Sequence, residues 1–231
     1  MWSCTVFNSG KTIFLDIRKE NCMKLLSLDM STRRTGWAVF DNEKLIAYNL
    51  IEIQGKETSE RTTYMYDKIQ ELITSYHIDC IVCEDVPVSI HSDLDVGKNL
   101  CVLQGCLLAI AHTHHIKMYT LRPTAWRTEI GIHHTLYKCD TCNNSFEDIS
   151  GLEFKICNKC GEKDKKKLHK DQINDRVALK ERAVKMANDV FGTNLQYISK
   201  YSKKNQDDIA EAILVGYSYL KKENGDNGRK N

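Results

Sequence analysis

Apolar and polar positions alternate in three short runs near the start of the chain, and this alternation predicts strands. Asp41, Asn42 and Glu43 provide turn residues between the second run and the third, so the runs are expected to form an antiparallel meander. The runs are KLLSLD over 24–29, TGWAVFD over 35–41 and KLIAYNLIEI over 44–53.

The pattern then changes to alternating helices and strands. Residues 59–77 carry apolar side chains at helical spacing, such as Ile69 and Ile73. The segment IDCIVCED over 78–85 is apolar on both faces, which is typical of a central parallel strand. A largely apolar helix and a fifth strand are expected over 94–115 and 116–121. The order predicts an α/β fold, in which a mixed β-sheet is flanked by helices.

Residues 132–171 interrupt this pattern with a polar segment that contains several cysteines. Helical spacing resumes over 174–192, where Gly192 is expected to end the helix. A last helix is expected over 206–222.

These elements divide the chain into one main domain and one inserted module. Residues 1–22 fit no element, and one hypothesis is that translation starts at Met23, so that this N-terminal extension is not translated. The polar end, 223–231, is expected to be disordered. The main domain is assigned to 23–134 and 172–222, and the inserted module to 135–171.

The composition narrows the class of protein. Hydrophobic residues make up 42% and charged residues 28% of the 231 positions, which is typical of a soluble globular protein. No apolar run is long enough to span a membrane and the N-terminus lacks a secretory signal, so a cytoplasmic protein is expected. Because the net charge is only +2, binding to nucleic acid would depend on local basic patches.

Acidic residues stand at the ends of predicted elements. Asp29 closes the first strand, Glu84 closes the fourth, and Asp208 and Glu211 lie on one face of the last helix. If the first and fourth strands are neighbours, these carboxylates converge, and their repulsion would be relieved by Mg²⁺ or Mn²⁺. Two such ions are the standard device for phosphodiester hydrolysis. The alternative is that Asp29 caps a turn and that Asp207 and Asp208 are first-turn acids favoured by the helix dipole.

Several motifs together resemble the RuvC-like Holliday junction resolvases of the RNase H-like nuclease superfamily, in particular their phage-type members. The matching segments run from about Met23 to Leu220, with the cysteine region as an insertion. They are LSLDMSTRRTGWAVF, IVCED, GKNLCVLQGCLLAIA, LRPTAWRTEIG and DDIAEAI.

The resemblance implies an RNase H-like fold and a set of functional residues. It makes Asp29, Glu84, Asp208 and Glu211 the catalytic acids that hold two Mg²⁺ or Mn²⁺ ions. Glu211 departs from the usual aspartate, and Asp207 is the alternative ligand. Lys180, in ALKERA, matches a region where the family places a basic residue near the DNA backbone. A phage source, and thus the host cytoplasm, is also implied.

The inserted module carries two CxxC pairs, CDTC and CNKC, which enclose 14 residues. Four cysteines at this spacing predict one structural Zn²⁺ in a zinc ribbon. The alternative, a pair of disulfides, is disfavoured in the cytosol. The predicted zinc ligands are Cys139, Cys142, Cys157 and Cys160.

A lysine-rich run, KDKKKLHK over 163–170, follows the second cysteine pair. It is interpreted either as a solvated linker or as an arm that contacts phosphates and makes binding depend on salt. The residues predicted to bind DNA are Arg33, Arg34, Arg127, Lys165, Lys166, Lys167 and Lys180.

The leading hypothesis is a crossover junction endodeoxyribonuclease of DNA recombination and repair, which cleaves Holliday junctions or other branched DNA. Symmetric cutting of two strands calls for a homodimer, and residues 100–110 are either its interface or part of the monomer core. One alternative is a nuclease that acts on RNA or RNA–DNA hybrids. Another is a non-catalytic zinc-ribbon DNA-binding protein.

Overall fold

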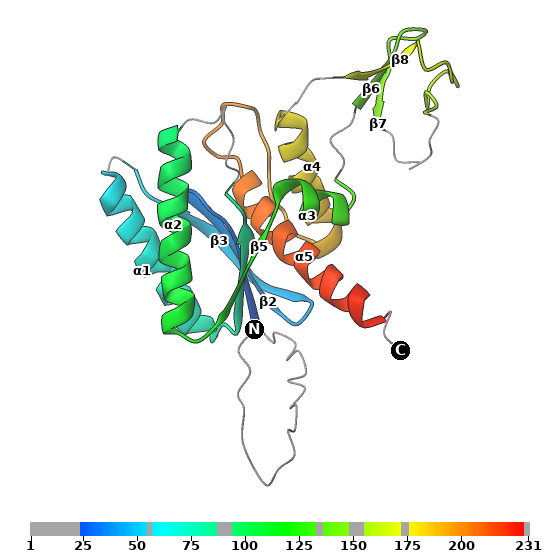
Figure 1. Cartoon of the computed structure of the whole chain (residues 1–231). Helices are drawn as coiled ribbons and strands as arrows, with labels where there is room; N and C mark the ends of the chain where they lie inside the picture. Colours follow the sequence, from blue (N-terminus) through cyan, green and yellow to red (C-terminus); the bar gives the residue numbers. More distant parts are fainter. Residues whose placement is uncertain are drawn as a thin grey trace, which may run out of the picture.

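The computed structural model describes residues 24–54, 57–86, 94–132, 136–147, 155–171 and 176–228 (Figure 1). The hypothesis about residues 1–22 therefore lies outside the described residues, as do 229–231.

A five-stranded mixed sheet forms the centre of the molecule. Its order is β3-β2-β1-β4-β5, in which β2 is antiparallel to both β1 and β3, and β4 and β5 run parallel to β1. The strands are β1 (Lys24–Asp29), β2 (Arg34–Asp41), β3 (Lys44–Glu52), β4 (Cys80–Glu84) and β5 (Lys117–Leu121). The predicted meander and the predicted adjacency of the first and fourth strands are both confirmed.

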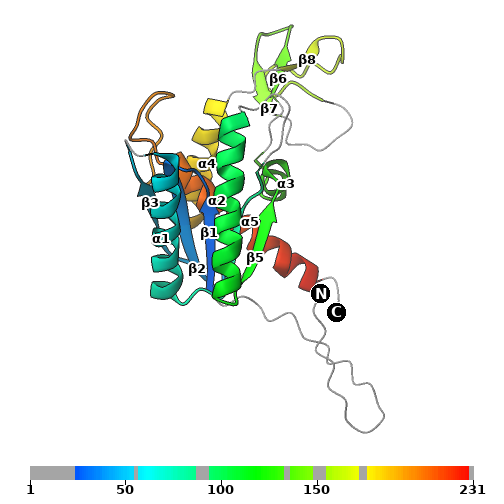
Figure 2. The ribbon, with the colours of Figure 1, turned by 60° about the vertical axis from the view of Figure 1, so that its left-hand side comes forward.

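Helices cover both faces of this sheet (Figure 2). One face packs against α1 and α2, and the other packs against α3, α4 and α5. The helices are α1 (Thr58–Tyr76), α2 (Leu94–Thr113), α3 (Pro123–Glu129), α4 (Arg176–Phe191) and α5 (Asp207–Gly228).

The two hydrophobic cores follow from the alternation of side chains along the central strands. In β1, Leu25 lies in the core under α5, whereas Leu26 and Leu28 lie in the core under α1 and α2. In β4, Val82 lies in the core under α5 and Cys83 lies in the core under α1 and α2. Both strands are therefore buried on two sides, as their apolar sequences predict.

Two helices differ from the sequence-based prediction. The segment around Trp126 was expected only as a motif, but it forms α3, which begins at Pro123 in the favoured first helical position. Helix α5 extends to Gly228, beyond the predicted end of the last helix at residue 222. Extending a helix that is already anchored costs little, which explains why the polar sequence stays helical. Gly192 ends α4 in a left-handed conformation, as predicted, with φ of 65°.

The inserted segment forms a separate three-stranded sheet, which stands apart from the main sheet in Figure 1. Its order is β7-β6-β8, and both pairings are antiparallel. The strands are β6 (Leu136–Cys139), β7 (Ser145–Glu147) and β8 (Leu168–Asp171). The end of the lysine-rich run is thus a strand of this sheet and not part of a free arm. Within the described residues, no helix is both long and apolar enough to cross a membrane.

Candidate active site and four-cysteine centre

The ends of β1 and β4 meet the start of α5 at one edge of the sheet. Leu28 pairs with Cys83, so Asp29 and Glu84 follow side by side on parallel neighbours. Gly36 is paired with Asp29, and a Cβ atom on Gly36 would lie 1.9 Å from the carbonyl oxygen of Asp208. The glycine therefore lets the first turn of α5 approach the sheet directly beside Asp29.

Asp29 is the acid at the centre of this arrangement. Its pKa is raised well above the ordinary value by burial first, and then by the negative charges of Glu211, Glu84 and Asp208. Lys180 opposes the rise. Across the described ranges, no hydrogen bond or ion pair reaches the Asp29 carboxylate. The structure thus brings the four predicted acids together and leaves the central one without a directly bonded basic partner among the described residues.

Two of the other acids share one arginine. The Nη2 atom of Arg127 lies 2.8 Å from Oε1 of Glu211 and 3.4 Å from Oε1 of Glu84. The indole Nε1–H of Trp126 donates a hydrogen bond of 2.6 Å to the same Glu84 oxygen. Helix α3 therefore holds both glutamates from one side.

Asp208 is held by Arg34, which was predicted to contact DNA. The Nε atom of Arg34 donates to Oδ2 of Asp208 at 2.9 Å. The rest of the guanidinium donates to the carbonyl oxygens of Lys203 and Asn205, at 2.8 and 2.9 Å. These internal partners give Arg34 a positioning role at the start of α5, because they leave its guanidinium few donors for a phosphate. Arg33, by contrast, is exposed.

Asp207 is paired with a lysine. Its side chain is buried and forms an ion pair with Lys180 of α4. Burial lowers the pKa of Lys180, but the hydrogen bond and charge of Asp207 outweigh it, so the pKa is raised overall. Glu211, after burial, is the largest of the charges that raise the pKa of Asp29, whereas Asp207 is engaged by Lys180.

The donor set of this cluster fits a hard divalent cation. It consists of carboxylate oxygens, which Mg²⁺ and Mn²⁺ prefer, around a buried carboxylate whose charge Lys180 offsets only in part. The carboxylates are not drawn tightly together. In the part of the chain that the structure describes, the four cysteines are the one potential metal-binding group whose ligand atoms all lie within 4.8 Å of one another. Arg127 instead bridges two of the acids, Glu84 and Glu211.

The four predicted zinc ligands come together in the small sheet. The Sγ atoms of Cys139 and Cys160 are 3.6 Å apart, as are those of Cys142 and Cys157. Tetrahedral zinc with Zn–S bonds of about 2.3 Å would separate its sulfur ligands by about 3.8 Å. All four are free thiols here, so the disulfide alternative is not what the structure contains. The cluster is compatible with a zinc ribbon.

Backbone amides lower the pKa of one thiol in this centre. Burial raises the pKa of the Cys157 thiol, but hydrogen bonds from the backbone of Cys160 and Lys159 outweigh it and lower the pKa to about 6. Glu162 also connects the two cysteine loops, since it accepts a 2.7 Å hydrogen bond from the Thr141 hydroxyl. That bond and two backbone N–H groups lower the pKa of Glu162 to about 2.

The predicted DNA-binding lysines lie beside the cysteine centre. Lys165, Lys166 and Lys167 are exposed, and Lys167 forms an ion pair with Glu162 at 3.4 Å. They occupy the turn before β8, which fixes their backbone next to the second cysteine loop.

Sequence reasoning missed the roles of Trp126 and Gly36. Both stood in segments that were singled out as motifs, but neither was given a function. A tryptophan in a short polar helix and a glycine within an apolar strand were the available signals. Neither signal identifies the residue that is contacted, because Glu84 is distant in sequence from Trp126, and Asp208 is distant from Gly36.

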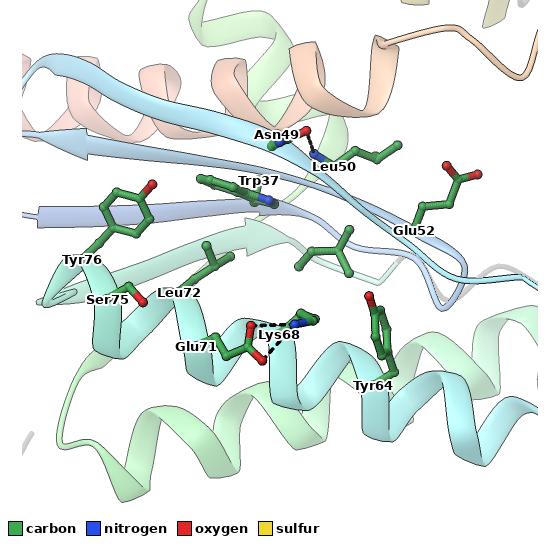
Figure 3. Close-up of a pocket in the computed structure, with 11 residues that line it drawn as sticks. Trp37, Asn49, Leu50, Glu52, Tyr64, Lys68, Glu71, Leu72, Ser75 and Tyr76 are labelled. Carbon is green, nitrogen blue, oxygen red and sulfur yellow. Dashed lines mark hydrogen bonds and ion pairs between the residues drawn. The ribbon is translucent and has the colours of Figure 1, made fainter.

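A cavity of about 730 Å³ lies between β3 and α1 (Figure 3). Trp37, Tyr64 and Tyr76 contribute aromatic walls, and Lys68 and Glu71 neutralise each other at its edge. None of the four clustered acids lines it. The cavity is thus separate from the candidate active site.

No protein-family model matches the sequence, and no curated protein matches it. Among solved structures, RuvC of Thermus thermophilus in complex with a Holliday junction substrate is similar, with a TM-score of 0.56 at 10% sequence identity. The match covers 88% of this chain and 96% of that chain. A second structure of Thermus thermophilus RuvC gives a TM-score of 0.54 at 11% identity and covers 88% and 97%. The chain therefore has the predicted RuvC-like, RNase H-like fold.

Proposed function

We propose that this protein is a metal-dependent endonuclease that cleaves Holliday junctions or other branched DNA. The observation that carries the proposal is the buried Asp29 carboxylate at the end of β1, which is near Glu84, Asp208 and Glu211 and has no hydrogen bond or ion pair within the described residues. The fold adds support, because similar solved structures are those of RuvC, one of them in complex with a Holliday junction substrate.

The four acids would hold two Mg²⁺ or Mn²⁺ ions, which supply the activated water and the stabilised leaving oxygen of phosphodiester hydrolysis. The chain's own residues fix the geometry. Arg34 anchors Asp208, and Trp126 orients Glu84 through its 2.6 Å hydrogen bond. Lys180 pairs with Asp207 next to the cluster and offsets part of the charge of this buried acid, which raises the pKa of Asp208 after burial does.

The inserted module would bind one structural Zn²⁺ and supply DNA contacts. Its four sulfur atoms are already close to tetrahedral spacing without a metal. Lys165 and Lys166 are exposed beside this centre, where they would contact phosphates. Binding should therefore weaken steeply as salt concentration rises.

The α2 helix is the proposed interface of a homodimer, which paired cutting of two strands requires. One side of α2 contributes Leu103 and Leu107 to the core. On the other side Val102 is 50% and Leu108 is 61% exposed, so apolar area remains uncovered. Sedimentation should show a dimer for wild type and a monomer for Leu108→Glu. Val190→Glu, which changes an exposed apolar residue on α4, should leave the dimer intact. A wild-type monomer at high concentration would contradict this part of the proposal.

The decisive experiment is cleavage of a synthetic four-way junction with Mg²⁺. Wild type should make paired cuts, and Asp29→Asn should lose about 10³-fold of the rate while it still binds the junction. Asp189→Asn, which removes an exposed carboxylate on α4, is the matched control.

The alternatives are separate outcomes of this experiment. Preferred cutting of an RNA–DNA hybrid or RNA in parallel reactions would favour the RNase-type alternative. Absence of metal-dependent cutting on junctions, flaps, hybrids and RNA, with binding retained, would favour a non-catalytic DNA-binding protein.

A further inference from the structure

The guanidinium of Arg127 lies between two of the proposed metal ligands. One nitrogen, Nη2, reaches both Glu211 and Glu84, at 2.8 and 3.4 Å. The three side chains are largely shielded, with exposed fractions of 14% for Arg127, 13% for Glu211 and 23% for Glu84. The contact is thus stronger than a typical surface ion pair.

The neighbouring tryptophan holds Arg127 in this position. Trp126 is 1% exposed and anchors α3 in the core. The guanidinium carbon of Arg127 lies 4.5 Å from the centre of the Trp126 ring, which is cation–π contact. The same ring donates to Glu84, so the tryptophan and the arginine act together on one carboxylate.

Arg127 and Arg34 differ in the kind of partners they have. Arg34 also donates to two backbone carbonyl oxygens, which a metal ion would leave in place. The hydrogen bonds and ion pairs of Arg127 to other side chains, over the residues that the structure describes, go to Glu84 and Glu211 alone. A cation bound by these two carboxylates would therefore compete with Arg127 for both of its acidic partners.

We propose that Arg127 is a resident counter-cation, which holds Glu84 and Glu211 in place before metal binds and which a divalent ion must displace. The inference rests on the proposed function, because that assigns the two glutamates as metal ligands. Two cations cannot share the same carboxylate oxygens at hydrogen-bonding distance without strong repulsion. Arg127 thus stabilises the metal-free fold, weakens metal binding, and makes metal loading an exchange of one cation for another.

The test is Mn²⁺ binding, followed by the electron paramagnetic resonance signal of the free ion, on protein whose cysteine centre is filled with zinc. Arg127→Gln should bind Mn²⁺ on the order of tenfold more tightly than wild type, because the competing charge is gone. Arg122→Gln is the matched control, since it removes an exposed arginine at the start of the same helix and should leave the affinity within about twofold.

Thermal unfolding gives a second measurement on the same variants. Without added divalent ion, Arg127→Gln should melt at a lower temperature than wild type, because two shielded carboxylates lose their counter-ion. With saturating Mn²⁺, its melting temperature should rise more than that of wild type. Unchanged or weaker Mn²⁺ binding by Arg127→Gln would overturn the inference.

The wild-type protein provides a test that does not require this variant to fold. Displacement of Arg127 from the Trp126 ring should change tryptophan emission at the midpoint of Mg²⁺ binding, and Trp126→Phe gives the contribution of the other tryptophans. Emission that does not respond while Mg²⁺ binds would contradict displacement. If wild type binds no divalent ion, or if Asp29→Asn binds it equally well, it is the proposed active site that fails.

Discussion

The two candidate metal centres of this protein are built in opposite ways. The cysteine centre takes all its ligands from residues 139–160, whereas the carboxylate centre combines β1, β4 and α5. Among the thiols, Cys157 has its pKa lowered to about 6, in part by backbone N–H groups. The carboxylates are destabilised by one another and by burial, and three bases partly compensate them.

This difference separates a structural site from an exchangeable one. A local, sulfur-rich site can close around one metal ion and remain filled. A site assembled from distant elements needs substitutes for the metal while it is empty, and Arg127 and Arg34 fill that need at Glu211 and Asp208. The two centres should therefore respond independently to mutation and to chelators.

The largest effect is expected from Cys157→Ser. The variant should lose its bound zinc and the fold of the small sheet, because four thiolates supply much of the folding free energy of such a module. Mn²⁺ binding at the carboxylate centre should persist, since no cysteine contributes to it. Zinc analysis together with Mn²⁺ titration checks both statements, and loss of Mn²⁺ binding would show that the centres depend on each other.

Gly36→Ala should disturb the carboxylate centre and the packing of α5, but not the cysteine centre. The added methyl group would overlap the Asp208 carbonyl, so we expect a loss of about 3 kcal/mol in the free energy of unfolding. Gly105→Ala is the control, because its methyl group would meet nothing within 4 Å and should stabilise α2 by about 0.5 kcal/mol. Urea denaturation measures both, and equal stabilities would contradict the close packing of α5.

A smaller effect is expected from Trp126→Phe. The ring volume is largely kept, but Glu84 loses its 2.6 Å hydrogen bond, which should cost about 1–2 kcal/mol. Zinc content should not change. Trp37→Phe, on the other side of the sheet, is the comparison. An equal loss in the free energy of unfolding of both variants, measured by urea denaturation, would argue against a specific role for Trp126.

The smallest effect is a dependence of stability on pH. Because the folded-state pKa of Asp29 is raised above 3.8, ionising Asp29 costs the metal-free folded protein more than the unfolded chain. That penalty is absent below pH 3.8 and grows as pH rises through the folded-state pKa. Metal-free Asp29→Asn should therefore gain stability relative to wild type as pH rises, and Mg²⁺ should remove the difference. Urea denaturation at a series of pH values from below 3.8 upward, with and without Mg²⁺, measures the free energy of unfolding of both proteins.

Much of the fold could be predicted from the sequence, because its signals are local. Alternation identified the strands, helical spacing identified most helices, and the CxxC pairs identified the cysteine centre. The misses were also local in origin. Helix α3 is only seven residues long, and the end of α5 carries no apolar pattern beyond Tyr219 and Leu220.

The candidate active site was predicted less completely. The four acids were identified because each stands at the end of an element, and the strand order places two of them side by side. Their basic partners could not be predicted. Arg34 and Arg127 were interpreted as DNA contacts, since an arginine gives no local sign of which acid it will pair with.

The sequence by itself determined the elements, the four clustered cysteines and the acids at the element ends, because periodicity and short spacings act over a few residues. Only the tertiary structure decided how these acids are compensated. The contact between Arg34 and Asp208 spans 174 positions, and that between Arg127 and Glu211 spans 84. Such pairs exist only after α3 and α5 have packed on the sheet, and this packing also places Glu211 beside Asp29 while Asp207 turns to Lys180.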